Sequence, residues 1–249
     1  MGIIYKDYCV AFIDILGFKE MTSSIDKLKE FANTCDFAIQ KMKDFSPNTL
    51  ENIDKTRIHS LQGADSMFFM FPKEFMYIFL MIHRLRVLQF LLAMNGIYIR
   101  GAICSGSIYI DDINKVYFGE AWNKAVLKEK KAQYPRIIIE NNIQKIIKDK
   151  LDSINEGVME YIIDDDGLFI IPPFTVLGGF ELFLDKEYTE IYKEVFLYIE
   201  INAERNKLDK SILQKLYWIS KHIEKEQYNE VKEKAKEVSN YLLSLIQND

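Results

Sequence analysis

The feature that most constrains the fold is an apolar run with one carboxylate near its end. Residues 9–16 read CVAFIDIL, and Asp14 is the only charged side chain among them. A strand buried on both faces of a sheet has this near-continuous apolar pattern, and a lone charge within it is costly unless an opposite charge lies against it. We therefore predict a strand over residues 5–15 whose Asp14 faces a cation, most simply a divalent metal ion.

A second stretch repeats this pattern. Gly63 and Asp65 precede the apolar run 67–71, and the two aspartates are 51 positions apart (65 − 14). Mg²⁺ is commonly held by one or two carboxylates together with substrate phosphates, so this pair predicts phosphoryl or nucleotidyl chemistry with Mg²⁺ or Mn²⁺. The main-chain carbonyl of Ile15 is a further predicted ligand. The alternative is that Asp14 caps the following helix and Asp65 is an ordinary turn residue.

Residues near these aspartates predict how an anionic substrate would be held. The turn formed by Leu16, Gly17 and Phe18 opens a helix, whose free N–H groups and dipole favour phosphate. Arg100 lies within a predicted strand, and its planar fork suits a carbonyl oxygen or a phosphate. The alternative for Arg100 is a structural ion pair. Further positive charge comes from Lys128, Lys130, Lys131 and Arg136.

The order of elements predicts the fold class. We expect strands over 5–15, 56–61, 66–71, 97–110 and 136–139, and helices over 18–43, 73–95 and 120–133, with residues 45–48 breaking the first helix. The order β-α-β-β-α-β-α-β favours an α+β fold, a ferredoxin-like or palm-type antiparallel sheet with helices packed on it. Residues 75–94 are the most apolar long segment, but central charges make a buried amphipathic helix the expectation and exclude a membrane span.

Beyond residue 140 we expect an extension. A short helix is followed by a hairpin over 161–171 that turns at residues 164–167, and then by two long helices over 186–206 and 210–247. We therefore divide the chain into a catalytic core, 1–140, and a C-terminal hairpin and helical extension, 141–249, packed on that core.

Composition limits the partners. The net charge of −5 gives no reason to expect nucleic acid as a partner. The three cysteines are unpatterned, and Cys9 and Cys104 fall in predicted strands, where a thiol is a small apolar filler. We expect a cytoplasmic protein.

Four segments resemble the class III nucleotidyl cyclases. Residues 11–18 (AFIDILGF) are similar to the first metal motif of that family, and residues 63–67 (GADSM) fall where it has its second metal aspartate. Residues 100–106 (RGAICSG) match the strand after the second helix, and residues 117–123 (YFGEAWN) resemble the segment leading to the family's transition-state asparagine, here Asn123. The resemblance covers roughly residues 5–140.

Three positions depart from the purine-specific members of that family. They carry a lysine where this chain has Leu61, a base-reading aspartate where it has Val116, and a transition-state arginine where it has Leu127. Apolar side chains cannot satisfy the hydrogen-bonding edge of a purine base. The usual purine pocket is therefore not expected.

The chain more nearly resembles the compact bacterial pyrimidine cyclases of Pycsar-type anti-phage defence, on features that include the pair Asp65 and Ser66, Arg100-Gly101 and Phe118-Gly119. The resemblance implies cyclisation of UTP or CTP to a 3′,5′-cyclic nucleotide and pyrophosphate, and a product that acts on a separate effector. It further implies a homodimer in which Asp14 and Asp65 of one subunit hold two metal ions, while Arg100, Asn123 or basic residues of the other complete the site. A nucleotide-binding module without activity and a palm-type nucleotidyltransferase remain alternatives.

Overall fold

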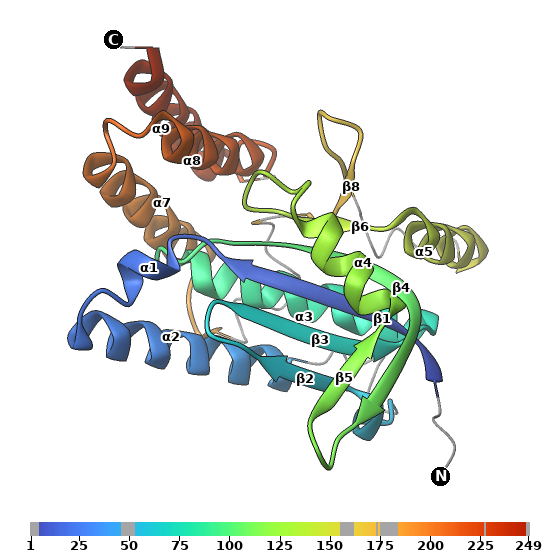
Figure 1. Ribbon diagram of the computed structural model, residues 1–249. Coiled ribbons are helices and arrows are strands. Elements are labelled where there is room, and N and C mark those ends of the chain that lie inside the picture. Colours follow the sequence, from blue (N-terminus) through green and yellow to red (C-terminus); the bar gives the residue numbers. More distant parts are fainter. Residues whose placement is uncertain are drawn as a thin grey trace.

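A mostly antiparallel sheet runs through the protein (Figure 1). The computed structural model describes residues 5–45, 53–154, 162–172, 174, 184–226 and 228–247. The strand order is β2-β3-β1-β4-β6-β8-β7, β5 pairs with the far end of β4, and the pairing of β4 with β6 is parallel. The strands are β1 (Tyr5–Ile15), β2 (His59–Gln62), β3 (Ser66–Pro72), β4 (Ile99–Asp111), β5 (Val116–Gly119), β6 (Ile137–Ile139), β7 (Ile162–Ile163) and β8 (Phe169–Ile170).

Helices cover both faces of this sheet. The α+β prediction is confirmed, and so is the presence of helices beyond the core. The helices are α1 (Phe18–Met21), α2 (Ile25–Asp44), α3 (Phe75–Ala93), α4 (Glu120–Glu129), α5 (Asn141–Ile154), α7 (Tyr188–Arg205), α8 (Lys210–Ile223) and α9 (Asn229–Gln247), with a 3₁₀ turn at Lys55–Arg57.

The period-two alternation of β1 divides the core between the two faces. Cys9, Ala11 and Ile13 belong to the large cluster packed with α2 and α3, whereas Tyr8 and Val10 belong to a smaller cluster beneath α4. By the same alternation, Asp14 lies on the same face of β1 as Tyr8 and Val10. The carboxylate therefore falls on the α4 face, where fewer side chains cover the sheet. Cys9, Cys35 and Cys104 are free thiols, all buried.

Helix α3 is buried on almost every side, so the expected burial of this helix is confirmed, but its expected amphipathic character is wrong. Sixteen of its 19 residues are buried, including His83 and Arg84, because α2 and the sheet enclose it. The guanidinium of Arg84 donates to the main-chain carbonyls of Lys43 and Phe45. By length and composition α3 could cross a bilayer, but 89% of its most apolar window is buried inside the protein.

The expected helix over residues 18–43 is two helices. Thr22 ends α1, and Ser24 caps α2 by accepting a hydrogen bond from the Lys27 amide. Serine at such a position competes with helix continuation by satisfying a free N–H, which explains the break. Residues 46–48 of the expected break after this helix lie outside the described residues.

Three further boundaries differ from expectation. Residues 116–119, expected only as a lead-in, form β5, and α4 ends at Glu129 rather than at residue 133. Residues 55–57 form the 3₁₀ turn, so β2 begins later than predicted.

The second long C-terminal helix is also two helices, α8 and α9. A single helix of 38 residues would be about 57 Å long and would leave its apolar stripe without a partner. By turning back, the chain packs Val231, Ala235 and Val238 of α9 against α8, and the hydroxyls of Ser220 and Ser239 meet at 2.8 Å. Side chains of α7, α8 and α9 join the large core, and β8 extends the sheet from β6. The division at residues 140 and 141 stays a prediction.

The expected hairpin after α5 is present as β7 and β8, with Tyr161 outside the described residues. The sequence suggested that Arg136 supplies positive charge at the predicted site. The turn of this hairpin prevents that. Arg136 is buried, and its guanidinium contacts Asp164 and Asp166 of the turn. Its charge is thus neutralised locally.

Candidate functional site

Asp14 and Arg100 lie side by side on adjacent strands. They are direct partners in the register of β1 and β4, and Nη2 of Arg100 is 3.2 Å from Oδ2 of Asp14. The side chains are 22% and 29% exposed, so the pair borders solvent. Asp14 makes no helix cap, because Gly17 takes the N-cap position of α1. The structure thus places a cation against Asp14, as the apolar run requires, but that cation is a guanidinium.

This contact corrects the expected division of Arg100 and Asp14 between two subunits. Strands β1 and β4 are neighbours in one chain, and their register sets Arg100 opposite Asp14. Both residues therefore belong to the same half of any dimeric site. Within this chain Arg100 forms an ion pair with Asp14, as the alternative for Arg100 predicted.

Glu129 completes the group and was not predicted as a site residue. It is the last residue of α4, its side chain is only 5% exposed, and its carboxylate contacts Nε of Arg100. The signal was present in the sequence: Ala121, Ala125 and Glu129 recur every four residues, which places one acid on the buried stripe of a helix. An acid in such a position requires a partner, and Arg100 is that partner.

Asp65 lies in the turn between β2 and β3, beside the end of β1. The Ile15 amide donates to the Asp65 carbonyl at 2.9 Å, and Ser66 is the register partner of Asp14. The Asp65 side chain is exposed, and its charge is close enough to raise the pKa of Asp14. The two predicted aspartates are thus brought together, and Asp65 is also the turn residue that the alternative described.

Burial controls the protonation of the two acids that share Arg100. Loss of hydration raises the pKa of Asp14, and the Asp65 charge adds to this, while Arg100 opposes it. Burial likewise raises the pKa of Glu129, against the effect of Arg100 and with a contribution from Asp14. One guanidinium serves two partly dehydrated carboxylates, so it does not fully compensate either of them.

The turn at Leu16, Gly17 and Phe18 fits the predicted phosphate cradle only in part. Gly17 has a φ of 78°, which a side chain would disfavour, and the turn directly follows β1. However, α1 has only four residues, so its dipole is small, and the Leu16 amide already donates to the Tyr98 carbonyl at 2.9 Å. The helix-dipole part of that expectation is therefore wrong.

Asn123 is exposed on α4 and does not join the Asp14 group within the chain. It precedes Glu129 by six residues, which rotates it to another side of the helix. Its neighbour Trp122 stacks on Phe68 of β3, with ring centroids 3.5 Å apart and planes 10° apart, and so anchors α4 to the sheet. Asn123 is therefore presented outward from a well-fixed helix.

The donor set at Asp14 fits a magnesium-like ion that shares its ligands with a substrate. Across the described ranges no group of three or more histidine, cysteine, aspartate or glutamate side chains is arranged to hold a metal. Two carboxylates and the Ile15 carbonyl are hard oxygen donors, and Mg²⁺ typically takes its remaining ligands from phosphates and water. The mutual repulsion of Asp14 and Asp65 is what such an ion would relieve.

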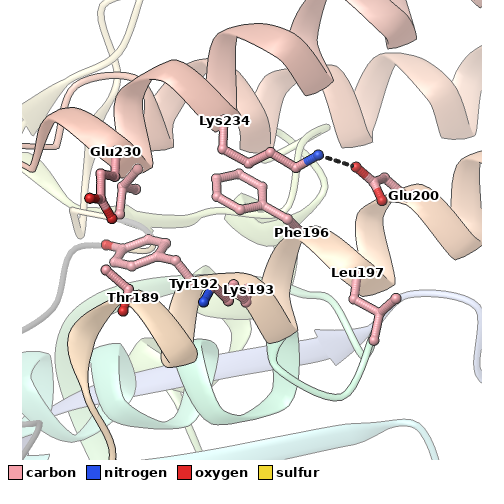
Figure 2. Close-up of a pocket in the computed structure, with 9 residues that line it drawn as sticks. Thr189, Tyr192, Lys193, Phe196, Leu197, Glu200, Glu230 and Lys234 are labelled. Atoms are coloured by element: carbon pink, nitrogen blue, oxygen red, sulfur yellow. Dashed lines mark ion pairs between the residues drawn. The ribbon is translucent and has the colours of Figure 1, made fainter.

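A pocket of about 440 Å³ lies elsewhere, between α7 and α9 (Figure 2). Tyr192, Phe196 and Val231 contribute its apolar lining, and the ion pair of Lys234 with Glu200, 2.9 Å long, crosses one end. None of the predicted site residues lines it. The candidate site is therefore the Asp14 group, whose chemistry singles it out, and not this pocket.

Comparison with known proteins gives similarity at the level of structure alone. No family model and no curated protein matches the sequence. The adenylyl cyclase CyaB from P. aeruginosa is 18% identical, over 60% of this chain and 84% of that chain, with a TM-score of 0.44. The guanylyl cyclase Cya2 is 11% identical over 70% and 95%, with a TM-score of 0.49.

A third similar structure is the catalytic core of a rhodopsin-guanylyl cyclase with converted specificity, in complex with ATPαS. It is 14% identical over 67% of this chain and 93% of that chain, with a TM-score of 0.41. Identities and scores at this level support no conclusion about the reaction or the substrate of this chain.

Proposed function

We propose that the protein is a metal-dependent pyrimidine nucleotide cyclase that converts UTP or CTP to a 3′,5′-cyclic nucleotide and pyrophosphate. The observation that carries this proposal is the meeting of Asp14 and Asp65 at the end of β1, beside the guanidinium of Arg100. Two acids and an arginine at one solvent-bordering point suit the binding of metal ions and a triphosphate.

Each residue has a role in this proposal. Asp14, Asp65 and the Ile15 carbonyl would hold Mg²⁺ or Mn²⁺, which would neutralise phosphate charge and lower the pKa of the ribose hydroxyl. Arg100 and Ser66 bind phosphate oxygens, with the turn at residues 16–18 beside them. The 3′ oxygen bonds to the α-phosphorus as the bond to pyrophosphate breaks, and the hydroxyl proton passes to a phosphate oxygen of the substrate.

Pyrimidine specificity rests on Leu61 and Val116. Leu61 packs at the border of the small core under α4, and Val116 is exposed at the start of β5. Neither can donate to or accept from a purine edge, so a purine would lose hydrogen bonds without compensation. A smaller base, held through a carbonyl oxygen, is the substrate class that these positions favour.

We further propose that two copies form the complete enzyme, with Asn123 of each copy reaching the site of the other. In support, large apolar side chains are exposed on β5 and α4: Val116, Phe118 and Leu127, the last of them 65% exposed. Such exposure beside an outward-facing asparagine suits an interface between copies. The cyclic product would then activate a separate effector in anti-phage defence.

One assay tests the reaction. The purified protein is incubated with each of the four labelled nucleoside triphosphates and Mn²⁺, and the products are resolved by chromatography. We expect a cyclic product from UTP or CTP that is lost in Asp14→Asn and in Asp65→Asn. The matched control is Asp36→Asn, which removes an exposed aspartate on α2, the helix on the face of the sheet opposite α4, and should retain activity.

The same assay distinguishes the alternatives. A nucleotide-binding module would bind a triphosphate in equilibrium dialysis and turn over none of the four. A palm-type nucleotidyltransferase would give linear products or extend a primer. A cyclic purine product would retain the cyclase but overturn its proposed specificity.

A further inference from the structure

We propose that Glu129 is a positioning residue, which holds Arg100 as the resident cation of Asp14 until a divalent ion displaces it. This inference rests on the metal site of the proposed function. It describes how the charge of Asp14 is balanced when no metal is bound. It also assigns a role to Glu129, which lies on α4, a helix that contributes no metal ligand in the proposed function.

The two contacts of Arg100 use different parts of its guanidinium. Nε, next to the aliphatic stem, meets Glu129, whereas the outer nitrogen Nη2 meets Asp14. A contact at Nε fixes the base of the planar group and leaves the outer nitrogens able to change partner. Arg100 can therefore leave Asp14 without leaving Glu129.

The difference in burial decides which contact is exchangeable. The Glu129 side chain is 5% exposed, while that of Asp14 is 22% exposed. Separating a buried carboxylate from the guanidinium that contacts it is far more costly than separating one that water can reach. The Glu129 contact is thus the permanent one, and the Asp14 contact is the one that a competing cation can replace.

The local charge favours that exchange. Asp14, Asp65 and Glu129 carry three formal negative charges, and Arg100 carries one positive charge, which leaves a net of −2. A divalent ion bound to Asp14 and Asp65 would balance the group. The outer nitrogens of Arg100 would then be released beside the ion, within reach of the phosphates that accompany it.

Binding of Mn²⁺ alone, without nucleotide, tests the inference. It can be followed by the electron paramagnetic resonance signal of free Mn²⁺ or by calorimetry. Removing the competing charge with Arg100→Gln should tighten Mn²⁺ binding about three- to tenfold. Glu129→Gln should weaken it, because Asp14 is then the sole carboxylate partner of the guanidinium.

The double variant separates an indirect role from a direct one. Once Arg100 is glutamine, Glu129 has no guanidinium to hold, so adding Glu129→Gln should change Mn²⁺ affinity no further. The matched control is Lys130→Gln, which removes a neighbouring exposed charge that does not touch Asp14 and should change affinity less than about twofold.

The outcomes are distinguishable from failure of the proposed function. If the wild type binds no Mn²⁺, or if its Mn²⁺ binding survives in Asp14→Asn, the metal site itself is wrong. If that binding is present but Arg100→Gln leaves it unchanged or weakens it, only the displacement is wrong. An equal effect of Glu129→Gln with and without Arg100 would make Glu129 a direct ligand.

Thermal unfolding checks that each variant is folded. If Glu129→Gln does not fold, it is replaced by Glu129→Asp, which shortens the side chain but keeps its charge.

Discussion

Arg136 and Asp164 form a buried ion pair between the start of β6 and the turn of the β7–β8 hairpin. Their side chains are 1% and 2% exposed. Asp164 also accepts a hydrogen bond from the indole of Trp218 at 3.2 Å, and the ring of His222 lies 3.4 Å away. One carboxylate thus connects the sheet, the hairpin and α8.

Replacing Asp164 should be strongly destabilising. Among the described residues, Asp164→Asn leaves the half-exposed Asp166 as the one carboxylate in contact with the buried guanidinium of Arg136, and breaking one partner of a buried pair costs about 3–5 kcal/mol. Urea unfolding at pH 7 measures the loss. Asp165→Asn, in the same turn but exposed, is the control and should change the free energy of unfolding by less than about 0.5 kcal/mol. Equal losses in the two variants would contradict a special role for Asp164.

The same carboxylate should make the protein sensitive to acid. Burial alone would raise the pKa of Asp164, but its hydrogen bonds with His222, the Asp165 amide and Arg136 outweigh this and hold the pKa below its ordinary value of 3.8. A depressed pKa stabilises the fold above that ordinary value, and the contribution is lost as the pH falls below it. Urea midpoints measured from pH 6 down to pH 2 should therefore drop in the wild type and drop less in Asp164→Asn.

Asp14 should show the opposite dependence on pH. Its pKa is raised by burial, so the folded state binds its proton more tightly than the unfolded chain does. The stability from this group is complete below the ordinary pKa of 3.8 and is lost as the pH rises through the raised value. At pH 7 that component is already lost, so Asp14→Asn removes only the solvent-bordering contact with Arg100, and the free energy of unfolding should fall by no more than about 1 kcal/mol. A larger loss would mean that Asp14 is mainly structural.

Gly101 should tolerate no side chain. A Cβ atom there would lie 2.5 Å from the Phe12 carbonyl oxygen and 2.6 Å from Cδ1 of Ile13, and the first of these is main chain that cannot rotate away. Gly101→Ala should cost about 1–3 kcal/mol and, because Arg100 is adjacent, reduce activity as well. The control for stability, Gly63→Ala, would meet the Ser66 hydroxyl at 3.0 Å, which can turn aside, and the Ser66 carbonyl oxygen at an ordinary 3.4 Å. Thermal unfolding measures both variants, and turnover is measured for Gly101→Ala alone, because Ser66 lies in the proposed site.

The proposed dimer should allow two inactive variants to restore activity. If each site combines Asp14 of one copy with Asn123 of the other, mixing Asp14→Asn with Asn123→Ala gives mixed dimers that have one intact site. After equal mixing and random exchange, the activity should reach about a quarter of that of the wild type. Activity no higher than the sum of the separate variants would place Asn123 in the same half of the site as Asp14, or outside the site.

Much of the fold was predictable because local patterns specify it. The apolar run before Gly17 predicts β1 over residues 5–15 as observed, and the glycine and aspartate before residues 67–71 predict the β2–β3 hairpin. The misplaced boundaries arise from short-range competition, as at Ser24, where a side chain caps a new helix. The burial of α3 on almost every side depends on α2, α5 and the sheet together, which its own sequence does not encode.

By itself, the sequence determined that Asp14 lies at the end of a buried strand and requires a cation, because a lone charge in an apolar run is unstable without one. Only the tertiary structure decided which cation this is. The register of β1 with β4 places Arg100 opposite Asp14, and the end of α4 brings Glu129 to the same guanidinium. Contacts between residues 86 and 29 positions apart (100 − 14 and 129 − 100) depend on the pairing of strands and the docking of a helix, which no local pattern specifies.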